Sequence, residues 1–268
     1  MESHVTHAQR WWLYALTGLT IAFLVLPSLI VIPMSFSGST AMMFPPPTWS
    51  FRWYETFFSS SQWLGATWIS IQVSICTVLL ATPIGIAAAY GLHLGTFVIN
   101  RAIYGMLIAS LMVPVILIAI GVYFVFAQLG MVNTRPALVL CDTLLAVPFV
   151  LVTVSAGLKG YDFNQEQVAR SLGASRLKAF LTVTLPQIRT SVIAAAFFAF
   201  IVAFDEVVIA SLMSGGTGAT LTNMMFASLR NEIDPTIAAI SSMMIVLTTI
   251  PPFIGHIVML RRKRRAAE

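Results

Sequence analysis

Charged side chains are scarce in this sequence. Asp, Glu, Lys and Arg make up only 9% of its 268 residues, whereas 58% are hydrophobic. A soluble globular domain carries about 25% charged residues, so the composition excludes that class and predicts an integral membrane protein. The net charge of +5 does not indicate nucleic-acid binding, because five basic residues form one cluster, residues 261–265, directly after an apolar run. That position is typical of an anchor at the membrane surface.

Motifs for catalysis and metal binding are missing as well. The sequence contains no G-x-x-x-x-G-K-[S/T] phosphate loop, no H-E-x-x-H and no G-x-S-x-G. We therefore expect no enzymatic activity and no cofactor bound by this chain, and any ATP and Mg²⁺ would be used by a partner subunit. The two cysteines, Cys76 and Cys141, lie in apolar runs without zinc or disulfide spacing. His4 and His7 lie close together near the N-terminus, where we expect a solvated tail rather than a weak metal site.

Six apolar runs are long enough to cross about 30 Å of hydrocarbon. They cover residues 12–34, 64–92, 102–129, 136–158, 191–213 and 236–260. The first run exceeds a signal-peptide core, so we expect it to be retained. Pro83, Pro114 and Pro148 lie inside runs and predict kinks rather than breaks. The sequence thus predicts an all-α integral membrane protein whose single domain spans residues 1–268.

The positions of lysine and arginine predict the orientation. With the N-terminus in the cytoplasm, twelve of the fifteen basic residues lie inside, and only Arg52, Arg135 and Arg230 lie outside. Both termini and the loop 159–190 are then cytoplasmic. Residues 35–63 form an outside loop with three prolines and several Trp and Tyr residues, a composition that fits the membrane interface.

Residues 162–186 are the only long polar interruption. Asp162 can begin a helix, and Gln165 three residues later completes a loose capping box. Gly173 is predicted to end that helix, because glycine adopts left-handed backbone angles without a side-chain penalty. A second helical piece then leads to Leu185 and Pro186. We expect the helix to be held against the membrane face, with one apolar side (Val168, Ala169, Leu172) and one polar side (Glu166, Arg170, Ser171).

This interruption resembles the cytoplasmic loop of ABC-importer permeases of the binding-protein-dependent type. In that family a Glu-Ala-Ala, three spacers, a Gly and a later Leu-Pro form the coupling helix, which docks into a groove on the ATPase. The matching positions are Gln167, Val168, Ala169, Gly173, Leu185 and Pro186. The acid stands one place early, at Glu166. The resemblance implies that the ATPase-coupling residues are Glu166, Gln167, Val168, Ala169, Leu172, Gly173, Ala174, Leu185 and Pro186. The alternative is an amphipathic helix on lipid headgroups with no partner.

Three other segments, residues 45–54, 197–215 and 234–241, are similar to spermidine/putrescine-type permeases. Two positions depart from that group: Asp142 stands where relatives often have histidine, and Thr190 where proline is common. The resemblance implies a type I ABC importer permease with six transmembrane helices in the bacterial inner membrane, working by alternating access. It also implies a homologous second permease subunit, two copies of an ATPase, an extracytoplasmic solute-binding protein and a polyamine cargo.

Three acidic residues, Asp142, Asp205 and Glu206, lie inside apolar runs. Because a carboxylate is costly in lipid unless it faces protein or water, a functional site is the first hypothesis for each. Asp205 and Glu206 would be neighbours on one helix and point about 100° apart. We hypothesise that one lines a translocation cavity, where it attracts a cationic substrate, and that the other bonds a neighbouring helix. The alternative is that all three are structural or gating groups.

Three other functions compete with this interpretation. An ion-coupled secondary carrier or channel would explain the acids but not the spacing of Ala169, Gly173 and Leu185-Pro186. An intramembrane enzyme would need a nucleophile and a base, which the spans lack. The same permease fold could import another small solute, such as an amino-acid derivative, an opine, thiamine or an iron chelate.

Overall fold

The computed structural model describes residues 11–95, 98–214, 218–231 and 234–265. Within these ranges the chain is helical apart from loops and one isolated bridge between Ser37 and Trp49. The predictions for His4, His7, Arg10 and Gly215 lie outside the described residues.

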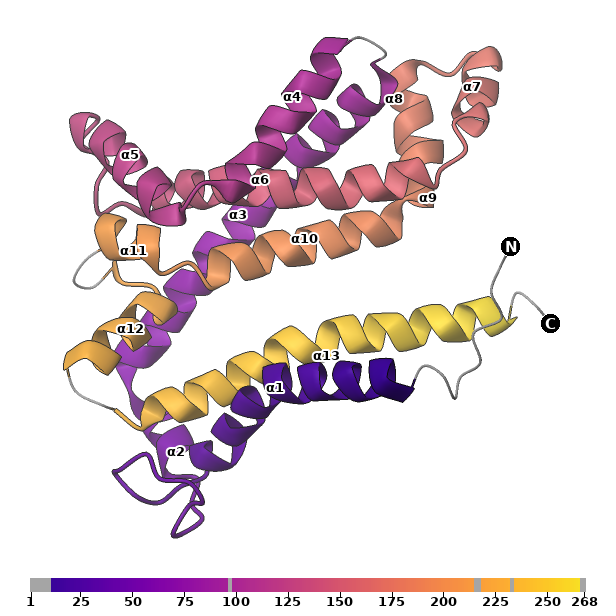
Figure 1. Ribbon diagram of the computed structural model, residues 1–268. Helices are drawn as coiled ribbons and strands as arrows, with labels where there is room; N and C mark the ends of the chain where they lie inside the picture. Colours follow the sequence, from indigo (N-terminus) through magenta and orange to yellow (C-terminus); the bar gives the residue numbers. More distant parts are fainter. Residues whose placement is uncertain (1–10, 96–97, 215–217, 232–233, 266–268) are drawn as a thin grey trace. The chain divides into compact units, whose positions relative to one another are not determined.

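Four helices of the described chain are long and apolar enough to cross a membrane: α1 (Trp11–Ser35), α3 (Ser61–Leu94), α6 (Arg135–Lys159) and the apolar part of α13 (Thr236–Arg265). Two bent helix pairs pass the same test, which gives up to six spans. The first pair joins Val98–Met112 to Val115–Gln128 at 101°, and the second joins Arg176–Gln187 to Arg189–Phe204 at 82°. The all-helical membrane fold predicted from the six apolar runs is therefore confirmed (Figure 1).

The third run is broken at Pro114 rather than kinked. Helix α4 (Val98–Ala109) ends in a 3₁₀ turn (Ser110–Met112), and α5 (Val115–Gln128) begins directly after the proline. Proline lacks an N–H and pushes the preceding residue into extended backbone angles, and Val113 has a ψ of 127°. Pro83 and Pro148 do not break their helices, and the kinks expected at these two positions stay predictions.

The fifth run is also interrupted. Helix α10 (Arg189–Phe204) ends just before Asp205, and α11 (Val208–Met213) begins just after Val207. The two acids therefore lie in a break and not on one continuous helix, which corrects their predicted geometry. Helix α12 (Leu221–Asn231) follows and was not predicted from the sequence.

Contacts within the chain gather into two units, residues 1–61 with 228–268 and residues 62–227. In the described part of the first unit, α13 packs against α1 and against α2 (Arg52–Ser59), a short helix within the predicted loop. Trp53 and Phe57 of α2 are buried, and the hydroxyls of Tyr54 and Ser35 lie 2.7 Å apart. The assignment of residues 1–268 to one domain stays a prediction.

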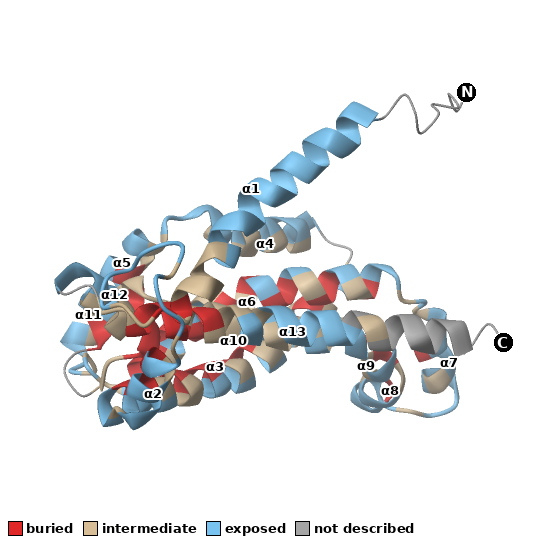
Figure 2. Ribbon diagram, turned by 90° about the horizontal axis from the view of Figure 1, so that it is seen from below, coloured by how far each residue is buried: buried red, intermediate tan, exposed pale blue. Residues whose placement is uncertain are grey.

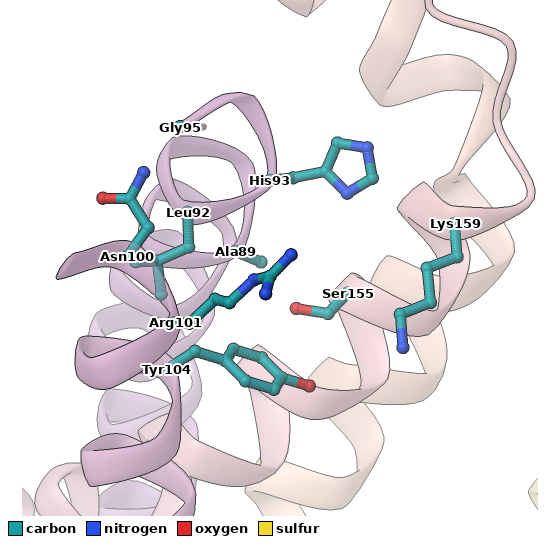
Figure 3. Close-up of a pocket in the computed structure, with 9 residues that line it drawn as sticks. All are labelled: Ala89, Leu92, His93, Gly95, Asn100, Arg101, Tyr104, Ser155 and Lys159. Atoms are coloured by element: carbon teal, nitrogen blue, oxygen red, sulfur yellow. The ribbon is translucent and has the colours of Figure 1, made fainter. Parts of the chain in front are cut away.

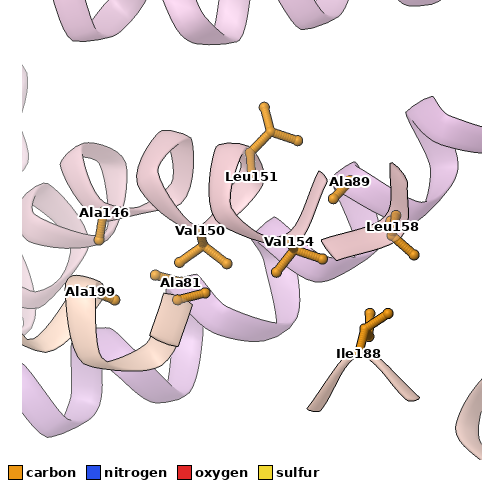
Figure 4. Packing of buried hydrophobic residues seen from close by; sticks show 10 residues of the cluster. Ala81, Ala89, Ala146, Val150, Leu151, Val154, Leu158, Ile188 and Ala199 are labelled. Carbon is orange, nitrogen blue, oxygen red and sulfur yellow. The ribbon is translucent and has the colours of Figure 1, made fainter. Parts of the chain in front are cut away.

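The second unit is built around the packing of α6 on α10, with α3 beside them (Figure 2). Small residues allow close approach, as is common between membrane helices. A Cβ atom on Gly85 would lie 2.5 Å from Cγ1 of Val150, so only glycine fits where α3 meets α6. Figure 4 shows the buried cluster between these helices. Its members are Ala81, Ala89, Ala146, Val150, Leu151, Val154, Leu158, Ile188, Ala195 and Ala199.

Candidate functional site

Helix α7 (Asn164–Ser171) occupies the polar interruption, beyond the end of α6 (Figure 1). At its start, Oδ1 of Asp162 accepts a hydrogen bond from the Asn164 N–H at 3.0 Å. The reciprocal half of a capping box is not formed, because Oε1 of Gln165 instead accepts from Nε2 of Gln187 at 3.4 Å.

Gly173 ends the helix as predicted. Its φ is +92°, and its N–H donates to the carbonyl of Arg170 at 3.0 Å. The N–H of Ala174 donates to the carbonyl of Ala169 at 3.1 Å. This pair of bonds satisfies the last carbonyls of the helix in the Schellman pattern, which requires a left-handed residue at this position.

Glu166 forms the inner anchor of α7. It is only 3% exposed, and each of its carboxylate oxygens accepts one hydrogen bond. The Tyr90 hydroxyl of α3 donates to Oε1 at 2.5 Å, and the Thr184 hydroxyl donates to Oε2 at 2.5 Å. The sequence grouped Glu166 with Arg170 and Ser171 on the polar side of the helix and did not predict that Glu166 would be buried. A buried carboxyl group is tolerated here because both oxygens have partners.

Aromatic rings surround this anchor. The Tyr90 ring lies 4.5 Å from that of Phe180, and the Arg176 guanidinium carbon lies 5.8 Å from the Tyr90 centroid. The ring of Phe163, just before α7, stacks on His93 at 4.6 Å. The carboxylate of Glu166 is thus enclosed by side chains from α3 and from both halves of the interruption.

The apolar side of α7 faces outward. Val168 is 60% exposed and Leu172 is 84% exposed, whereas Ala169 is half-buried. The next helix, α8 (Arg176–Ala179), adds Leu177, which is 68% exposed. The side of α7 that packs against the rest of the chain is the one that carries Glu166, and the expectation that the helix is held against the membrane face stays a prediction. Exposed apolar side chains next to one another are typical of a contact surface.

The remaining predicted coupling residues lie around α7 and α9 (Leu185–Gln187). Leu185 is half-buried and Pro186 is exposed in the first turn of α9, where a missing N–H costs nothing. Gln167 and Ala174 meet at a shallow polar cleft of about 510 Å³ between α7 and α8. The cleft is also lined by Arg170, Ser171, Ser175 and Arg176.

The intramembrane acids occupy three different environments. Glu206 is half-buried, and its Oε1 accepts a hydrogen bond from the Ile209 N–H at 2.8 Å, which caps α11. Asp205 is exposed at the end of α10. Asp142 of α6 is 3% exposed, and its Oδ1 has no hydrogen-bond partner among the described residues.

Glu206 also lines a cavity of about 720 Å³ whose walls come from α3, α4, α5, α6 and α10. Most of the lining is apolar, and Ser110 and Thr143 add two hydroxyl groups. Within the described chain, Glu206 is the only acidic residue of this lining.

Sequence reasoning missed Tyr90, Thr184 and Thr222. The Thr222 hydroxyl lies 3.3 Å from the carbonyls of Phe204 and of Glu206, at the break between α10 and α11. The sequence gives little indication that a single hydroxyl residue makes a functional contact, since its hydrogen-bond partner lies far away in sequence. No sequence signal links Tyr90 to Glu166, because the two residues are 76 positions apart.

The apolar helices and the amphipathic helix α7 indicate an integral membrane protein with a contact surface beyond the ends of its spans. Residues 81–264 match the family of binding-protein-dependent transport system inner membrane components, and the chain belongs to this family. It is a permease subunit and not an enzyme, as predicted.

Two curated relatives have names that describe polyamine transport. The putrescine transport system permease protein PotI of Escherichia coli K12 is 28% identical over 95% of this chain and 92% of its own length. The spermidine/putrescine transport system permease protein PotC of Haemophilus influenzae is 27% identical over 85% of this chain and 88% of its own.

Solved structures support the fold. A bacterial ABC transporter that imports the acidic polysaccharide alginate aligns with a TM-score of 0.72 over 95% of this chain and 96% of that chain, at 15% identity. An alginate transporter in complex with a pentasaccharide-bound periplasmic protein aligns with a TM-score of 0.66 over 92% of this chain and 93% of that chain, at 14% identity. The predicted type I importer permease fold is therefore confirmed.

Proposed function

We propose that this permease moves a polyamine such as putrescine or spermidine inward across the bacterial inner membrane by alternating access. The single observation that supports the cationic cargo most directly is Glu206 on the wall of the 720 Å³ cavity. A carboxylate in an apolar-walled cavity attracts a cation strongly, because little water screens its charge. The names of the PotI and PotC relatives support the same cargo. Asp142 and Asp205 belong to the same substrate pathway in this proposal.

The energy for transport comes, in this proposal, from an ATPase that docks on α7. The exposed side chains of Val168, Leu172 and Leu177 offer an apolar contact, while Glu166 holds the helix from behind. Two ATPase copies bind ATP and Mg²⁺, and a homologous second permease completes the pathway. A solute-binding protein outside the membrane delivers the cargo, and both termini of this chain lie in the cytoplasm.

Calorimetric titration of the cognate binding protein tests the cargo first. Putrescine, spermidine and a panel of amino-acid derivatives, opines, thiamine and iron chelates are titrated separately. Tight binding of a polyamine supports the proposal. Tight binding of another solute rejects the polyamine cargo and assigns the three acids to gating or structure.

A substitution at Leu172 tests the coupling role. Leu172→Asp places a charge on the apolar contact and should abolish ATP-driven uptake in proteoliposomes, whereas Leu172→Met keeps the contact apolar and should retain it. Co-purification of the ATPase provides the second measurement. Uptake that follows a proton gradient without ATP would identify an ion-coupled carrier instead.

A further inference from the structure

Another pocket lies at the end of the spans nearest α7, where α3 and α6 end and α4 begins (Figure 3). It has a volume of about 510 Å³. Three basic side chains line it, one from each helix: His93, Arg101 and Lys159. Asn100, Tyr104 and Ser155 add polar groups, and Ala89 and Leu92 contribute an apolar wall.

The positive charges of this pocket are not balanced within the described chain. No Asp or Glu is among the described residues that line the pocket, and neither Arg101 nor Lys159 forms an ion pair with a described residue. Figure 3 shows the Arg101 side chain extending into the space between α4 and α6, toward Ser155. Like charges that converge on one cavity repel each other unless an anion lies between them.

Stabilisation of helix ends does not explain the positions of all three basic residues. His93 and Lys159 lie in the last turns of α3 and α6, where a positive charge is favourable. Arg101 is the fourth residue of α4 and lies at the positive end of that helix, where a cation is unfavourable. An anion in the pocket would offset that cost and would pair with all three residues.

We propose that this pocket binds a phosphate group. The guanidinium of Arg101 can donate two parallel hydrogen bonds to phosphate oxygens, and Lys159 supplies a second full charge. The phosphate could come from an anionic lipid headgroup or from free phosphate in the cytoplasm. The position of the pocket favours the lipid, because its basic residues lie at span ends and its apolar wall, Ala89 and Leu92, suits acyl chains.

The bound phosphate would also lie next to the coupling segment. The ring of His93 stacks on Phe163, the residue that precedes α7, with a centroid distance of 4.6 Å. Lipid composition would then influence how firmly α7 is held. This consequence rests on the proposed coupling function, whereas the binding of phosphate does not.

Native mass spectrometry of the purified full-length chain tests the site. The protein is titrated with phosphatidylglycerol, and separately with zwitterionic phosphatidylcholine. Each Lys or Arg contributes about a fivefold gain in affinity for an anionic headgroup, so Arg101→Gln with Lys159→Gln should weaken phosphatidylglycerol binding by about 25-fold. Binding of phosphatidylcholine should not change.

Arg189→Gln is the matched control, since Arg189 is an exposed residue at the start of α10 that does not line the pocket. It should leave the affinity for phosphatidylglycerol unchanged. Equal affinity of the wild type and the double variant for this lipid would overturn the lipid site. Lys159→Gln alone, with an expected fivefold loss, gives the same test if the double variant fails to elute as a folded protein.

A separate titration with inorganic phosphate distinguishes the two sources. If inorganic phosphate displaces the lipid only at concentrations far above those in the cell, the natural ligand is the lipid headgroup. Tight binding of inorganic phosphate, lost in the double variant, would assign the pocket to free phosphate. Failure to bind either ligand overturns the proposal while leaving the transport function untouched.

Discussion

The carboxylate of Glu166 accepts hydrogen bonds from two hydroxyl groups that lie far apart in sequence, Tyr90 and Thr184. Removal of the carboxylate would leave the half-buried Tyr90 hydroxyl without its acceptor and would leave Thr184 only the longer bond to the Tyr161 hydroxyl at 3.3 Å. The cost of such a loss is about 1–3 kcal/mol for each unsatisfied group. The residue therefore links the stability of the protein to the position of α7.

We expect Glu166→Ala to lower the free energy of unfolding by about 2 kcal/mol or more, and Tyr90→Phe by about 1 kcal/mol. Thermal unfolding in detergent measures both. The exposed neighbour Gln167 serves as control, because Gln167→Ala removes no buried bond and should leave the unfolding temperature unchanged. A combined loss in Glu166→Ala with Tyr90→Phe equal to the sum of the single losses would contradict a shared interaction.

Gly173 provides a second test at this scale. Its φ of +92° is unfavourable for any other residue, although a Cβ atom there would meet nothing within 4 Å. Gly173→Ala should therefore cost about 1 kcal/mol through the backbone alone, and Gly173→Asn less, because asparagine tolerates this region better. Gly173→Trp should reach the membrane but lose ATP-driven uptake. Normal uptake by the tryptophan variant would argue against the coupling role of this helix.

Residue patterns predicted the ends of α7 better than its orientation. Asp162 and Gly173 act locally, through bonds to backbone groups within a few residues, so the sequence alone identifies them. The direction in which Glu166 points depends on Tyr90, whose position is set by tertiary packing. A helix that shows both an apolar and a polar side does not reveal which of them a neighbouring helix covers.

At the scale of elements, the break between α10 and α11 places Glu206 in two roles. Its carboxylate caps α11 through the Ile209 N–H, and it lines the cavity. A capping bond needs only an acceptor oxygen, whereas attraction of a cation needs the charge. The two roles can therefore be separated by substitution.

Glu206→Gln keeps an acceptor for the Ile209 N–H but removes the charge. We expect it to raise the apparent KM for a polyamine by about fivefold, as loss of about 1 kcal/mol of charge attraction implies, with little change in unfolding temperature. Glu206→Ala should in addition lower stability by about 1 kcal/mol, the usual cost of a lost cap. Asp205→Asn is compared in the same uptake assay. Unchanged KM in both Glu206→Gln and Asp205→Asn would remove these acids from the substrate path.

Apolar length predicted the spans, but not their interruptions. Run length depends on bilayer thickness, which the sequence reflects directly. Pro114 and the pair Asp205-Glu206 lie inside long apolar runs, so hydropathy alone joins helices that the backbone separates. Helix α12 was missed because it carries fewer apolar residues than a span, and its first turn is fixed by a bond from the Leu221 N–H to the Ser70 hydroxyl.

At the scale of the whole molecule, labelling of single cysteines tests the predicted orientation in the membrane. Single cysteines at Thr40, in the loop after α1, and at Lys178, on α8, are introduced after Cys76 and Cys141 are replaced by serine; both positions are exposed. A membrane-impermeant maleimide should label Thr40→Cys in intact cells and Lys178→Cys only after permeabilisation, because the distribution of basic residues places α8 in the cytoplasm. The opposite pattern would reverse the orientation.

Helix α3 is about 51 Å long, well beyond the 30 Å of hydrocarbon. Toward one end of α3, the Ser70 hydroxyl accepts a hydrogen bond from the Leu221 N–H at the start of α12. Thr222 of α12 in turn contacts the carbonyls beside the break after α10. Toward the other end of α3, the Tyr90 hydroxyl donates to Glu166 of α7. About 30 Å of helix separates these attachments, and Pro83 lies between them, where the backbone ladder lacks one bond. Helix α3 therefore connects the two attachment points through a single helix that bends most easily at Pro83. In the proposed coupling function, the bending stiffness of α3 at Pro83 would determine how much of a displacement of α7 reaches the residues beside Glu206.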